Sequence, residues 1–222
     1  MKSKTLKNLN IDGCLCINLE HRTDRKELLN KEFLESEINI EFIKAIADQN
    51  PEQGCYESHR RCAQIALERN YQRVLILEDD ATLKSFRDYQ INAINKTLKN
   101  KNPQIFYLGI ILGKLWLTWQ PGIARCRGQG AHAYILSKEA CEILAITPFQ
   151  NKAIDNFYSK NLRGYCAFPM ICEQQGGGIV SSDINPSNYK TEAEEFFWKK
   201  NKRKQYIEAA KNIDKTILRI DL

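Results

Sequence analysis

A run of four apolar residues followed directly by three carboxylates constrains this chain more than any other segment. Val74 to Leu77 form the apolar run, and Glu78, Asp79 and Asp80 follow it. An unbroken apolar run of this length is typical of a strand buried on both faces, as in the parallel sheets of α/β proteins. Three adjacent carboxylates repel one another and resist desolvation, so the end of this strand needs a positive partner. A hard divalent cation held by oxygen ligands meets that need, and open α/β sheets bind ligands at the carboxyl ends of their strands.

The first half of the chain alternates predicted strands with predicted helices. Strands are predicted over residues 14–19, 40–45, 74–77 and 105–108, helices over 23–37, 56–69 and 86–98, and a loop over 48–54. This order favours an α/β fold with a mostly parallel central sheet flanked by helices. The second half is predicted to hold a hairpin around residues 120–122, a strand over 131–136 and a helix that Ser137 caps.

Length and composition fit one globular domain. The 222 residues suffice for a single large α/β unit. No segment has 18 consecutive apolar residues, and residues 1–13 lack the apolar centre of a secretory signal, so we expect a cytoplasmic protein. Eight cysteines without a CxxC pair are then expected to be reduced thiols rather than a disulfide or zinc framework.

The formal net charge of +6 is concentrated in the tail, because residues 199–222 hold eight basic and three acidic side chains. A charge placed this way argues against a nucleic-acid-binding surface. Helical spacing predicts a basic amphipathic C-terminal helix within residues 191–222, with an apolar stripe of Tyr206, Ala210, Ile213, Ile217 and Ile220. Two interpretations stay open. The helix packs on the domain, or it lies on the surface and contacts anionic lipid headgroups at the inner face of the membrane.

Alternation along the strand separates the three carboxylates. Glu78 and Asp80 are predicted to point one way, toward one metal ion, and Asp79 the other way, toward a loop amide or a sugar hydroxyl. A divalent ion in such a place holds a pyrophosphate and neutralises the charge that develops on a leaving phosphate. The alternative is a solvated strand end that binds no ligand.

Two further segments place polar side chains after strands or at helix starts, where anions bind. Residues 17–25 (INLEHRTDR) contain Asn18, Arg22 and Arg25, and residues 54–62 (GCYESHRRC) contain Ser58 and His59. Arg22 and Arg25 can each clamp a phosphate, although each taken alone is more consistent with a surface ion pair.

The blocks at residues 17–25, 54–62 and 74–81 (VLILEDDA) resemble glycosyltransferase family 25 in sequence, order and spacing. That family includes bacterial lipooligosaccharide β-galactosyltransferases and the procollagen galactosyltransferases. Residues 128–137 (GQGAHAYILS) are similar to a fourth block of the family, with Gln129-Gly130 where Gly-Thr is usual. Residues 148–155 resemble a downstream element, so the resemblance spans about residues 12–185.

The resemblance implies a GT-A-like domain over residues 1–190, with a nucleotide-sugar-binding half at 12–112 and an acceptor half at 113–190. It implies an inverting transfer of a hexose, typically galactose, from a UDP-sugar to a glycan or lipid-linked saccharide such as lipooligosaccharide. Mn²⁺ or Mg²⁺ is the implied cofactor. By matching position, Glu78 and Asp80 are the metal ligands. The donor-binding candidates are Asn18, Arg22, Arg25, Ser58, His59, Asp79 and His132.

Inversion by one in-line displacement needs a base for the acceptor hydroxyl, and a positioned carboxylate contributes roughly 10²–10⁴-fold in rate. Asp155 at a predicted helix start is the first candidate, although a helix cap explains it equally well. Glu173 is the second candidate. His132 follows a glycine-rich turn and is as consistent with a metal or phosphate ligand as with a structural residue. Asp183 is expected in a loop that closes the site.

Two other functions stay open alongside sugar transfer. A metal-dependent phosphohydrolase would use Asp79 and Asp80, but that class is expected to carry its acidic pair after the first strand rather than the third. A non-catalytic relative would bind a sugar nucleotide without turning it over.

Overall fold

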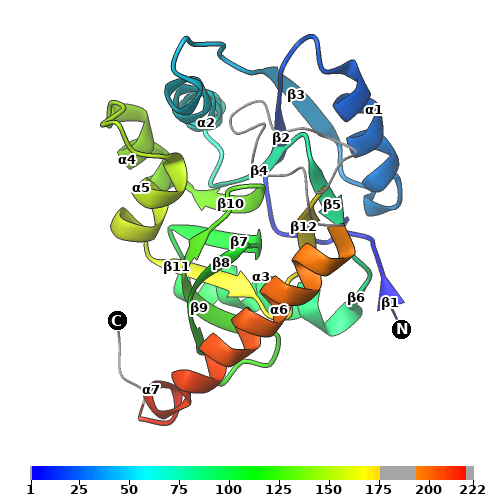
Figure 1. The fold of residues 1–222 in the computed structure, drawn as a ribbon, viewed down its shortest axis with the longest axis vertical. Helices are drawn as coiled ribbons and strands as arrows, with labels where there is room; N and C mark the ends of the chain where they lie inside the picture. The colour runs from blue at the N-terminus through cyan, green and yellow to red at the C-terminus, as the bar shows by residue number, and fades with distance from the viewer. Residues whose placement is uncertain (1, 176–193, 219–222) are drawn as a thin grey trace.

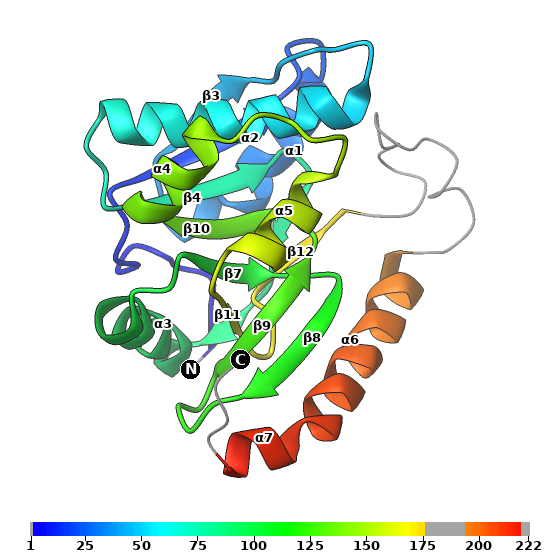
Figure 2. The same ribbon diagram turned by 90° about the vertical axis from the view of Figure 1, so that its left-hand side faces the viewer.

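An eight-stranded sheet forms the centre of the protein, with the strands in the order β3-β2-β4-β10-β7-β11-β9-β8 (Figures 1 and 2). The computed structural model describes residues 2–175 and 194–218, so Asp183 and Ile220 lie outside the described residues. The strands of the central sheet are β2 (Gly13–Asn18), β3 (Ile40–Lys44), β4 (Arg73–Glu78), β7 (Ile105–Gly109), β8 (Leu112–Leu117), β9 (Ile123–Gln129), β10 (Ala133–Ser137) and β11 (Gly164–Ala167).

Four short strands form two small two-stranded sheets beside the central one. They are β1 (Lys2–Ser3), which pairs with β6 (Phe86–Arg87), and β5 (Ala81–Leu83), which pairs with β12 (Cys172–Gln174). The pairing of β5 with β12 brings residues 172–174 next to the acidic end of β4.

The central sheet is mixed, so the expectation of a mostly parallel sheet is wrong. β2 is parallel to β3 and β4, and β7 is parallel to β11, but every other neighbouring pair is antiparallel. β10 comes from the second half of the chain yet lies between β4 and β7. Local periodicity could not reveal this insertion, because a strand carries the same pattern whichever way its neighbours run. The division into donor and acceptor halves stays a prediction.

Helices cover both faces of the sheet, because side chains alternate along each strand. On β4, Val74 and Ile76 join the core under α2, α4 and α5, whereas Leu75 and Leu77 join the core under α1 and α3. None of the four is more than 1% exposed, which confirms the strand buried on both faces. The bounds are α1 (Thr23–Glu32), the 3₁₀ turn η1 (Leu34–Ser36), α2 (Pro51–Glu68), α3 (Asp88–Lys101), α4 (Lys138–Ile146) and α5 (Ile154–Asn161).

Helix α2 starts at Pro51, inside the segment predicted to be a loop. The side chain of Asn50 accepts hydrogen bonds from the N–H groups of Glu52 at 3.1 Å and Gln53 at 3.4 Å. Pro51 suits the first helical position because it has no N–H that needs a partner there. The predicted cap at Ser137 is confirmed, since its hydroxyl accepts from an N–H in the first turn of α4.

The tail forms two helices, α6 (Glu194–Lys211) and α7 (Ile213–Ile217), that lie along β8, the last strand of the sheet (Figures 1 and 2). A helical tail was predicted correctly, but its packing face was not. The buried residues of α6 are Trp198, Asn201, Gln205 and Ala209, whereas the predicted stripe residues Tyr206, Ile213 and Ile217 are exposed.

All eight cysteines are free thiols, and all except Cys55 are buried. Among the described residues, no helix combines the length and the apolar composition that crossing a bilayer requires.

Gly54 fixes how closely α2 approaches the segment before it, and it yields a test of this packing. A Cβ atom at position 54 would lie 2.6 Å from the carbonyl oxygen of Ile46. Alanine normally stabilises a helix interior by ~1 kcal/mol relative to glycine. Because backbone must move here, we expect Gly54→Ala to lower the free energy of unfolding by ~1–3 kcal/mol in urea titrations. The control is Asn92→Ala, at an exposed position of α3, which should slightly raise the free energy of unfolding. A Gly54→Ala protein at least as stable as the wild type would contradict this packing.

Candidate functional site

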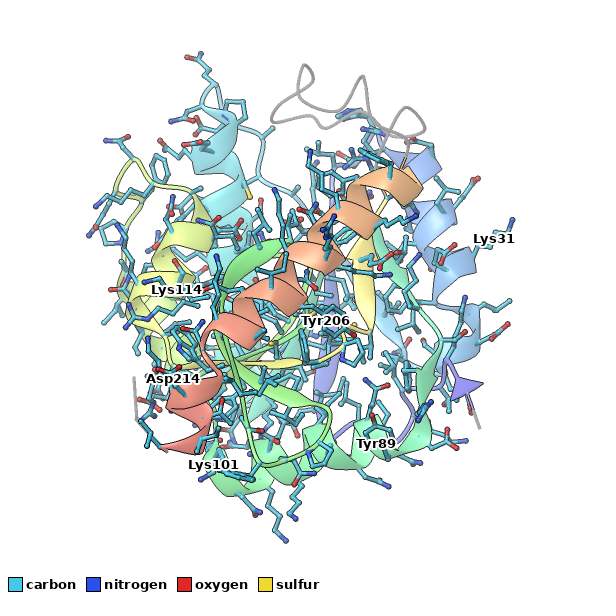
Figure 3. The ribbon with its side chains drawn as sticks, turned by 60° about the horizontal axis from the view of Figure 1, so that its bottom comes forward. Lys31, Tyr89, Lys101, Lys114, Tyr206 and Asp214 are labelled. Atoms are coloured by element: carbon cyan, nitrogen blue, oxygen red, sulfur yellow. The ribbon has the colours of Figure 1, made fainter. Side chains whose placement is uncertain are left out.

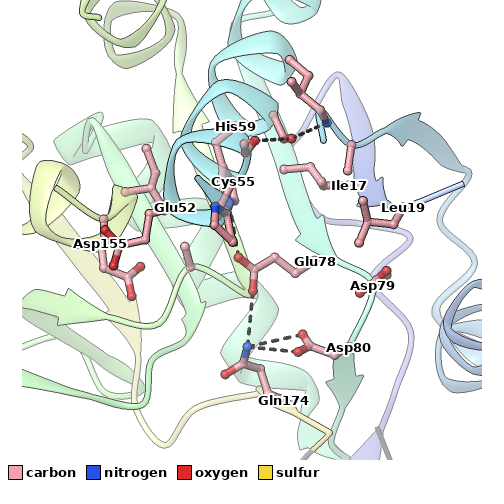
Figure 4. A pocket seen from close by; sticks show the side chains of 18 of the residues that line it. Ile17, Leu19, Glu52, Cys55, His59, Glu78, Asp79, Asp80, Asp155 and Gln174 are labelled. Atoms are coloured by element: carbon pink, nitrogen blue, oxygen red, sulfur yellow. Dashed lines mark hydrogen bonds and ion pairs between the residues drawn. The ribbon is translucent and has the colours of Figure 1, made fainter. Parts of the chain in front are cut away.

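A cavity of about 460 Å³ opens at the carboxyl ends of β2 and β4 (Figure 4). Its walls come from the ends of these strands, residues 45–48 with the first turns of α2, the turn before β10, the start of α5, and the end of β12. Neighbouring parallel strands of α/β proteins bind ligands at this end. The cavity is therefore the candidate site.

Glu78 and Asp80 share one side of the strand end, and Asp79 turns to the other, as alternation predicted. The side-chain amide of Gln174 on β12 donates to both carboxylates, at 3.3 Å to Glu78 Oε2 and at 3.3 and 3.4 Å to the two oxygens of Asp80 (Figure 4). One neutral amide group is thus shared by two acidic side chains.

Burial raises the pKa values of Glu78 and Asp80, and repulsion from the neighbouring carboxylates raises them further. The guanidinium of Arg25 opposes this rise only in part. Desolvation and like charge act in the same direction because both disfavour the ionised form. A divalent cation would remove both penalties, and two carboxylates supply the oxygen ligands that Mn²⁺ and Mg²⁺ prefer.

Asp79 is neutralised by a buried network. Arg25 Nη1 donates to its Oδ1 at 2.8 Å, and Asn18 Nδ2 donates to its Oδ2 at 2.8 Å. Asn18 also donates to the backbone carbonyl of Arg22, just before α1. The structure therefore brings together three predicted donor-binding residues and pairs them with one another. Removing one partner of such a buried pair leaves an uncompensated charge, which costs several kcal/mol.

Arg22 lies outside the residues that line the cavity. Its guanidinium makes a two-bond ion pair with Asp24, with Nε at 3.0 Å from Oδ1 and Nη2 at 2.9 Å from Oδ2. This pair lowers the pKa of Asp24 to about 2. The Arg22 side chain is only 13% exposed although Asp24 is 58% exposed, so its role as a donor-binding residue stays a prediction.

Ser58 lines the cavity but uses its hydroxyl to hold the wall. The oxygen accepts from the N–H of Ile46 at 2.8 Å and donates to the carbonyl of Gly54 at 2.7 Å. Ser58 thereby fixes residues 45–48 against α2.

His59 lines the cavity one residue further along α2 and touches the acidic pair. Its Nε2 lies 3.2 Å from Glu78 Oε1, and its Nδ1 lies 2.5 Å from the hydroxyl of Tyr134, which itself lies 2.8 Å from that of Tyr158. Burial lowers the pKa of His59 to about 4, so the ring is neutral near pH 7. One ligand atom each from Cys55, His59 and Glu78 lies within 4.8 Å of the others, and this group could hold a metal ion.

Asp155 faces Glu78 from the start of α5, on the other side of the cavity (Figure 4). Its Oδ2 accepts from the N–H of Gly130 at 2.9 Å, whereas its buried Oδ1 has no hydrogen-bond partner among the residues that the structure describes. Burial first, and then the charge of Glu78, raise the pKa of Asp155 to about 6. The side chain does not cap its own helix, so the alternative of a helix cap is wrong.

Glu173, the second candidate base, is not among the residues that line the cavity. It alternates with Gln174 along β12 and so points to the opposite side. Its carboxylate is buried and pairs with Lys84 at 2.9 Å and with Lys202 at 2.5 Å. These pairs fasten α6 to the sheet of β5 and β12.

His132 is fully buried and does not line the cavity either. Its ring packs against Trp198 with 6.0 Å between ring centroids, and burial lowers its pKa to about 4. Its backbone carbonyl accepts from the N–H of Glu78 at 2.9 Å. The structural interpretation of His132 agrees with this position, since its backbone helps to hold the end of β4.

Sequence reasoning missed Cys55, Tyr134 and Gln174. Cys55 had a signal, because its spacing of four residues from His59 places both on one face of a helix. For Tyr134 and Gln174, no pattern in the sequence indicated a place in the site. Each reaches the site through an antiparallel pairing, of β10 with β4 and of β12 with β5.

Comparison with known proteins finds one family model that matches part of this chain. Residues 49–127 match the model of glycosyltransferase family 25, described as an LPS biosynthesis protein family. Two of the four sequence blocks, at residues 54–62 and 74–81, fall inside this match. No curated protein is significantly similar in sequence.

Solved structures resemble the chain only distantly. Protein A197 from STIV is 11% identical, with 77% of this chain and 98% of that chain covered and a TM-score of 0.48. A glycosyltransferase involved in the glycosylation of the major capsid of PBCV-1 is 14% identical, with 67% and 66% covered and a TM-score of 0.38. Mannose-1-phosphate geranyltransferase from Thermus thermophilus is 11% identical, with 69% and 58% covered and a TM-score of 0.39.

At these scores the structural likenesses support no conclusion about this chain, and the assignment depends on the family match. That match agrees with the resemblance seen in the sequence blocks. Residues 49–127 are therefore similar to glycosyltransferase family 25.

Proposed function

We propose that this protein is an inverting, metal-dependent glycosyltransferase of GT-A type that moves a hexose, in the first instance galactose, from a UDP-sugar to a glycan or lipid-linked saccharide. The family match supports sugar transfer. The position of the cavity at the carboxyl ends of parallel strands supports a nucleotide-sugar site there. Its volume of about 460 Å³ is in the usual range for a small-molecule site.

One observation carries the proposal: a single cavity places an under-neutralised acidic pair opposite an isolated carboxylate. Glu78 and Asp80 share one amide donor, and Asp155 has one buried oxygen without a partner among the described residues. A single displacement requires these two kinds of group, one to hold the donor diphosphate through a cation and one to take a proton from the acceptor.

Glu78 and Asp80 are the residues that would hold Mn²⁺ or Mg²⁺. Their crowded, buried charge and their oxygen donors fit a hard divalent ion. The bound ion would neutralise the charge of the departing diphosphate. Cys55 and His59 add a softer thiol and imidazole beside Glu78, so metal titrations should include Zn²⁺ alongside Mn²⁺.

Asp155 is the base in this proposal. The acceptor oxygen bonds to the anomeric carbon as the bond to the UDP oxygen breaks, and the hydroxyl proton passes to Asp155 Oδ1. A pKa of about 6 suits this task. The carboxylate is ionised near pH 7 and is more basic than an ordinary aspartate.

The other predicted donor-binding residues divide into two groups in the proposal. His59 and Ser58 border the donor because both line the cavity. Asn18 and Arg25 act through Asp79 by holding the end of β4 in place. Because Asp79 is already paired with Arg25, the chain fits poorly with a phosphohydrolase that needs both Asp79 and Asp80 at its metal.

The proposed activity can be tested with a panel of UDP-hexoses. We expect Mn²⁺-dependent release of UDP, largest with UDP-galactose and abolished by EDTA. Asp155→Asn should lower kcat by roughly 10²–10⁴-fold, because the amide keeps the hydrogen bond from Gly130 but cannot accept the proton. UDP binding, measured by calorimetry, should be unchanged in this variant.

Asp12→Asn is the matched control for that experiment. Asp12 lies just before β2, at the opposite end of the sheet, and accepts from the N–H groups of Gln72 and Arg73 at 2.7 and 2.8 Å. Its amide can accept the same bonds, so turnover should stay at the wild-type level. Wild-type turnover in Asp155→Asn would contradict the assignment of the base. UDP binding without turnover in the wild type would favour the non-catalytic relative, and phosphate release from simple esters would favour the phosphohydrolase.

The acidic pair also predicts how stability depends on pH. Glu78 and Asp80 have higher pKa values in the folded chain than in the unfolded chain. Their contribution to stability is therefore greatest at low pH and is lost as the pH rises through the folded values. We expect the Tm of the metal-free protein to fall by roughly 2–4 °C for each kcal/mol lost between about pH 6.5 and 8. Excess Mn²⁺ should reverse most of this fall, because it binds the ionised pair.

Asp80→Asn separates this effect from other titrations. Removing one charge of the pair should flatten the pH dependence of Tm between about pH 6.5 and 8 and abolish most of the increase that Mn²⁺ causes. Asp12→Asn should keep both the wild-type pH dependence of Tm and the increase in Tm that Mn²⁺ causes. A wild-type Tm that neither falls over this range nor responds to Mn²⁺ would show that the pair is neither strained nor a metal site.

A further inference from the structure

The tail helices pack on the sheet through a mixed side that holds Trp198 and Ala209 as well as the polar Asn201 and Gln205. Gln205 Nε2 donates to the carbonyls of Ile110 at 2.8 Å and Ile111 at 3.1 Å. Asn212 Nδ2 donates to the carbonyl of Leu115 at 3.0 Å, and Thr216 Oγ1 donates to that of Leu117 at 2.7 Å. Because β8 is the last strand of the sheet, these side chains supply hydrogen bonds that a further strand would otherwise supply.

Packing through this mixed side leaves several large apolar side chains on the outer face. Six of the eleven exposed large hydrophobic residues in the described part of the chain lie on α6 and α7 or directly after them, at 46–67% exposure. They are Phe196, Tyr206, Ile207, Ile213, Ile217 and Leu218. Figure 3 looks onto this side and labels Tyr206 on α6 and Asp214 on α7. A cluster of this kind on one surface marks a contact with something apolar.

The same outer face is strongly cationic. Residues 196–218 contain seven basic and two acidic side chains, a net charge of +5. Lys202 is half-exposed and pairs with the buried carboxylate of Glu173. The exposed basic side chains of α6 are Lys199, Lys200, Lys202, Arg203, Lys204 and Lys211. Basic residues interspersed with aliphatic and aromatic ones suit a surface that is both anionic and apolar just beneath.

We propose that the outer face of α6 and α7 binds the surface of an anionic lipid bilayer, with Ile207 and Ile217 entering the interface and the lysines contacting lipid phosphates. The positive charge of this face favours an anionic bilayer over a second copy of the chain. A second copy of the chain would bring two strongly basic faces together, which is repulsive, whereas an anionic bilayer supplies both the opposite charge and an apolar layer. This inference does not depend on the proposed enzymatic activity.

Membrane binding would also place the cavity near the bilayer surface. The indole N–H of Trp198, in the second turn of α6, donates to the carbonyl of Gln174 at 2.8 Å, and Gln174 lines the cavity. The amino end of the lipid-binding helix is thus joined directly to the wall of the site. An acceptor carried on a lipid would reach the site without leaving the membrane surface.

The test is sedimentation of the full chain with phosphatidylcholine vesicles, with and without phosphatidylglycerol. We expect binding to the anionic vesicles only, weakened by high salt. The double variant Ile207→Ser/Ile217→Ser should bind at least ~10-fold more weakly, and so should Lys204→Glu/Lys211→Glu, each with a wild-type Tm because these side chains are exposed. Ile146→Ser removes an even more exposed isoleucine from the end of α4 and should bind as the wild type does.

Several results would overturn the proposal. These are wild-type protein that stays in solution with anionic vesicles at low salt, and binding that persists in the isoleucine double variant. A concentration-dependent dimer in analytical ultracentrifugation that is lost in that variant would also overturn it, and would make the face an interface between copies. Because no readout is enzymatic, failure here would leave the glycosyltransferase proposal unaffected.

Discussion

The ion pair between Arg25 and Asp79 determines what the rest of the acidic strand end can do. It joins α1 to the end of β4 in a buried setting, with Asn18 completing the carboxylate's hydrogen bonds. Because Arg25 pairs with Asp79, Glu78 and Asp80 are left to share the neutral amide of Gln174, with the ring of His59 beside Glu78. Their unfavourable burial is a property of the folded chain, and strongly perturbed pKa values in a cavity are typical of functional sites.

The part of this site that could be predicted depends on patterns that are local in sequence. The unbroken apolar run 74–77 revealed a strand buried on both faces, and alternation beyond it separated Asp79 from its two neighbours. Asp155 was identified as a carboxylate at a helix start, and the structure places it across the cavity from Glu78. In the first two cases the decisive interaction lies within a few residues of the motif or follows from a strand period of two. For Asp155 only the place at a helix start was local, because its contacts with Gly130 and Glu78 join distant segments.

The part that could not be predicted depends on pairings between distant segments. Gln174 meets the acidic pair because β12 pairs with β5, and His132 is buried because β10 is inserted between β4 and β7. The side on which the tail helix packs could not be predicted from the sequence either. Its apolar spacing suggested which side would be buried, but the buried side mixes Trp198 and Ala209 with Gln205, whose amide donates to the carbonyl of Ile110 just before β8. The carbonyls at this edge of the sheet receive donors from a segment distant in sequence, and local spacing does not reveal such a pairing.

Because the tail helices shield β8, the chain cannot be shortened past them without exposing a strand edge. A strand with unoccupied carbonyls at the margin of a sheet is a template onto which another polypeptide can add, and this is a common start of aggregation. A version of the protein that ends before α6 would keep the cavity's acidic residues but expose this template. The last two helices are therefore a condition for the remaining domain to stay dispersed at high concentration, whatever else they contact.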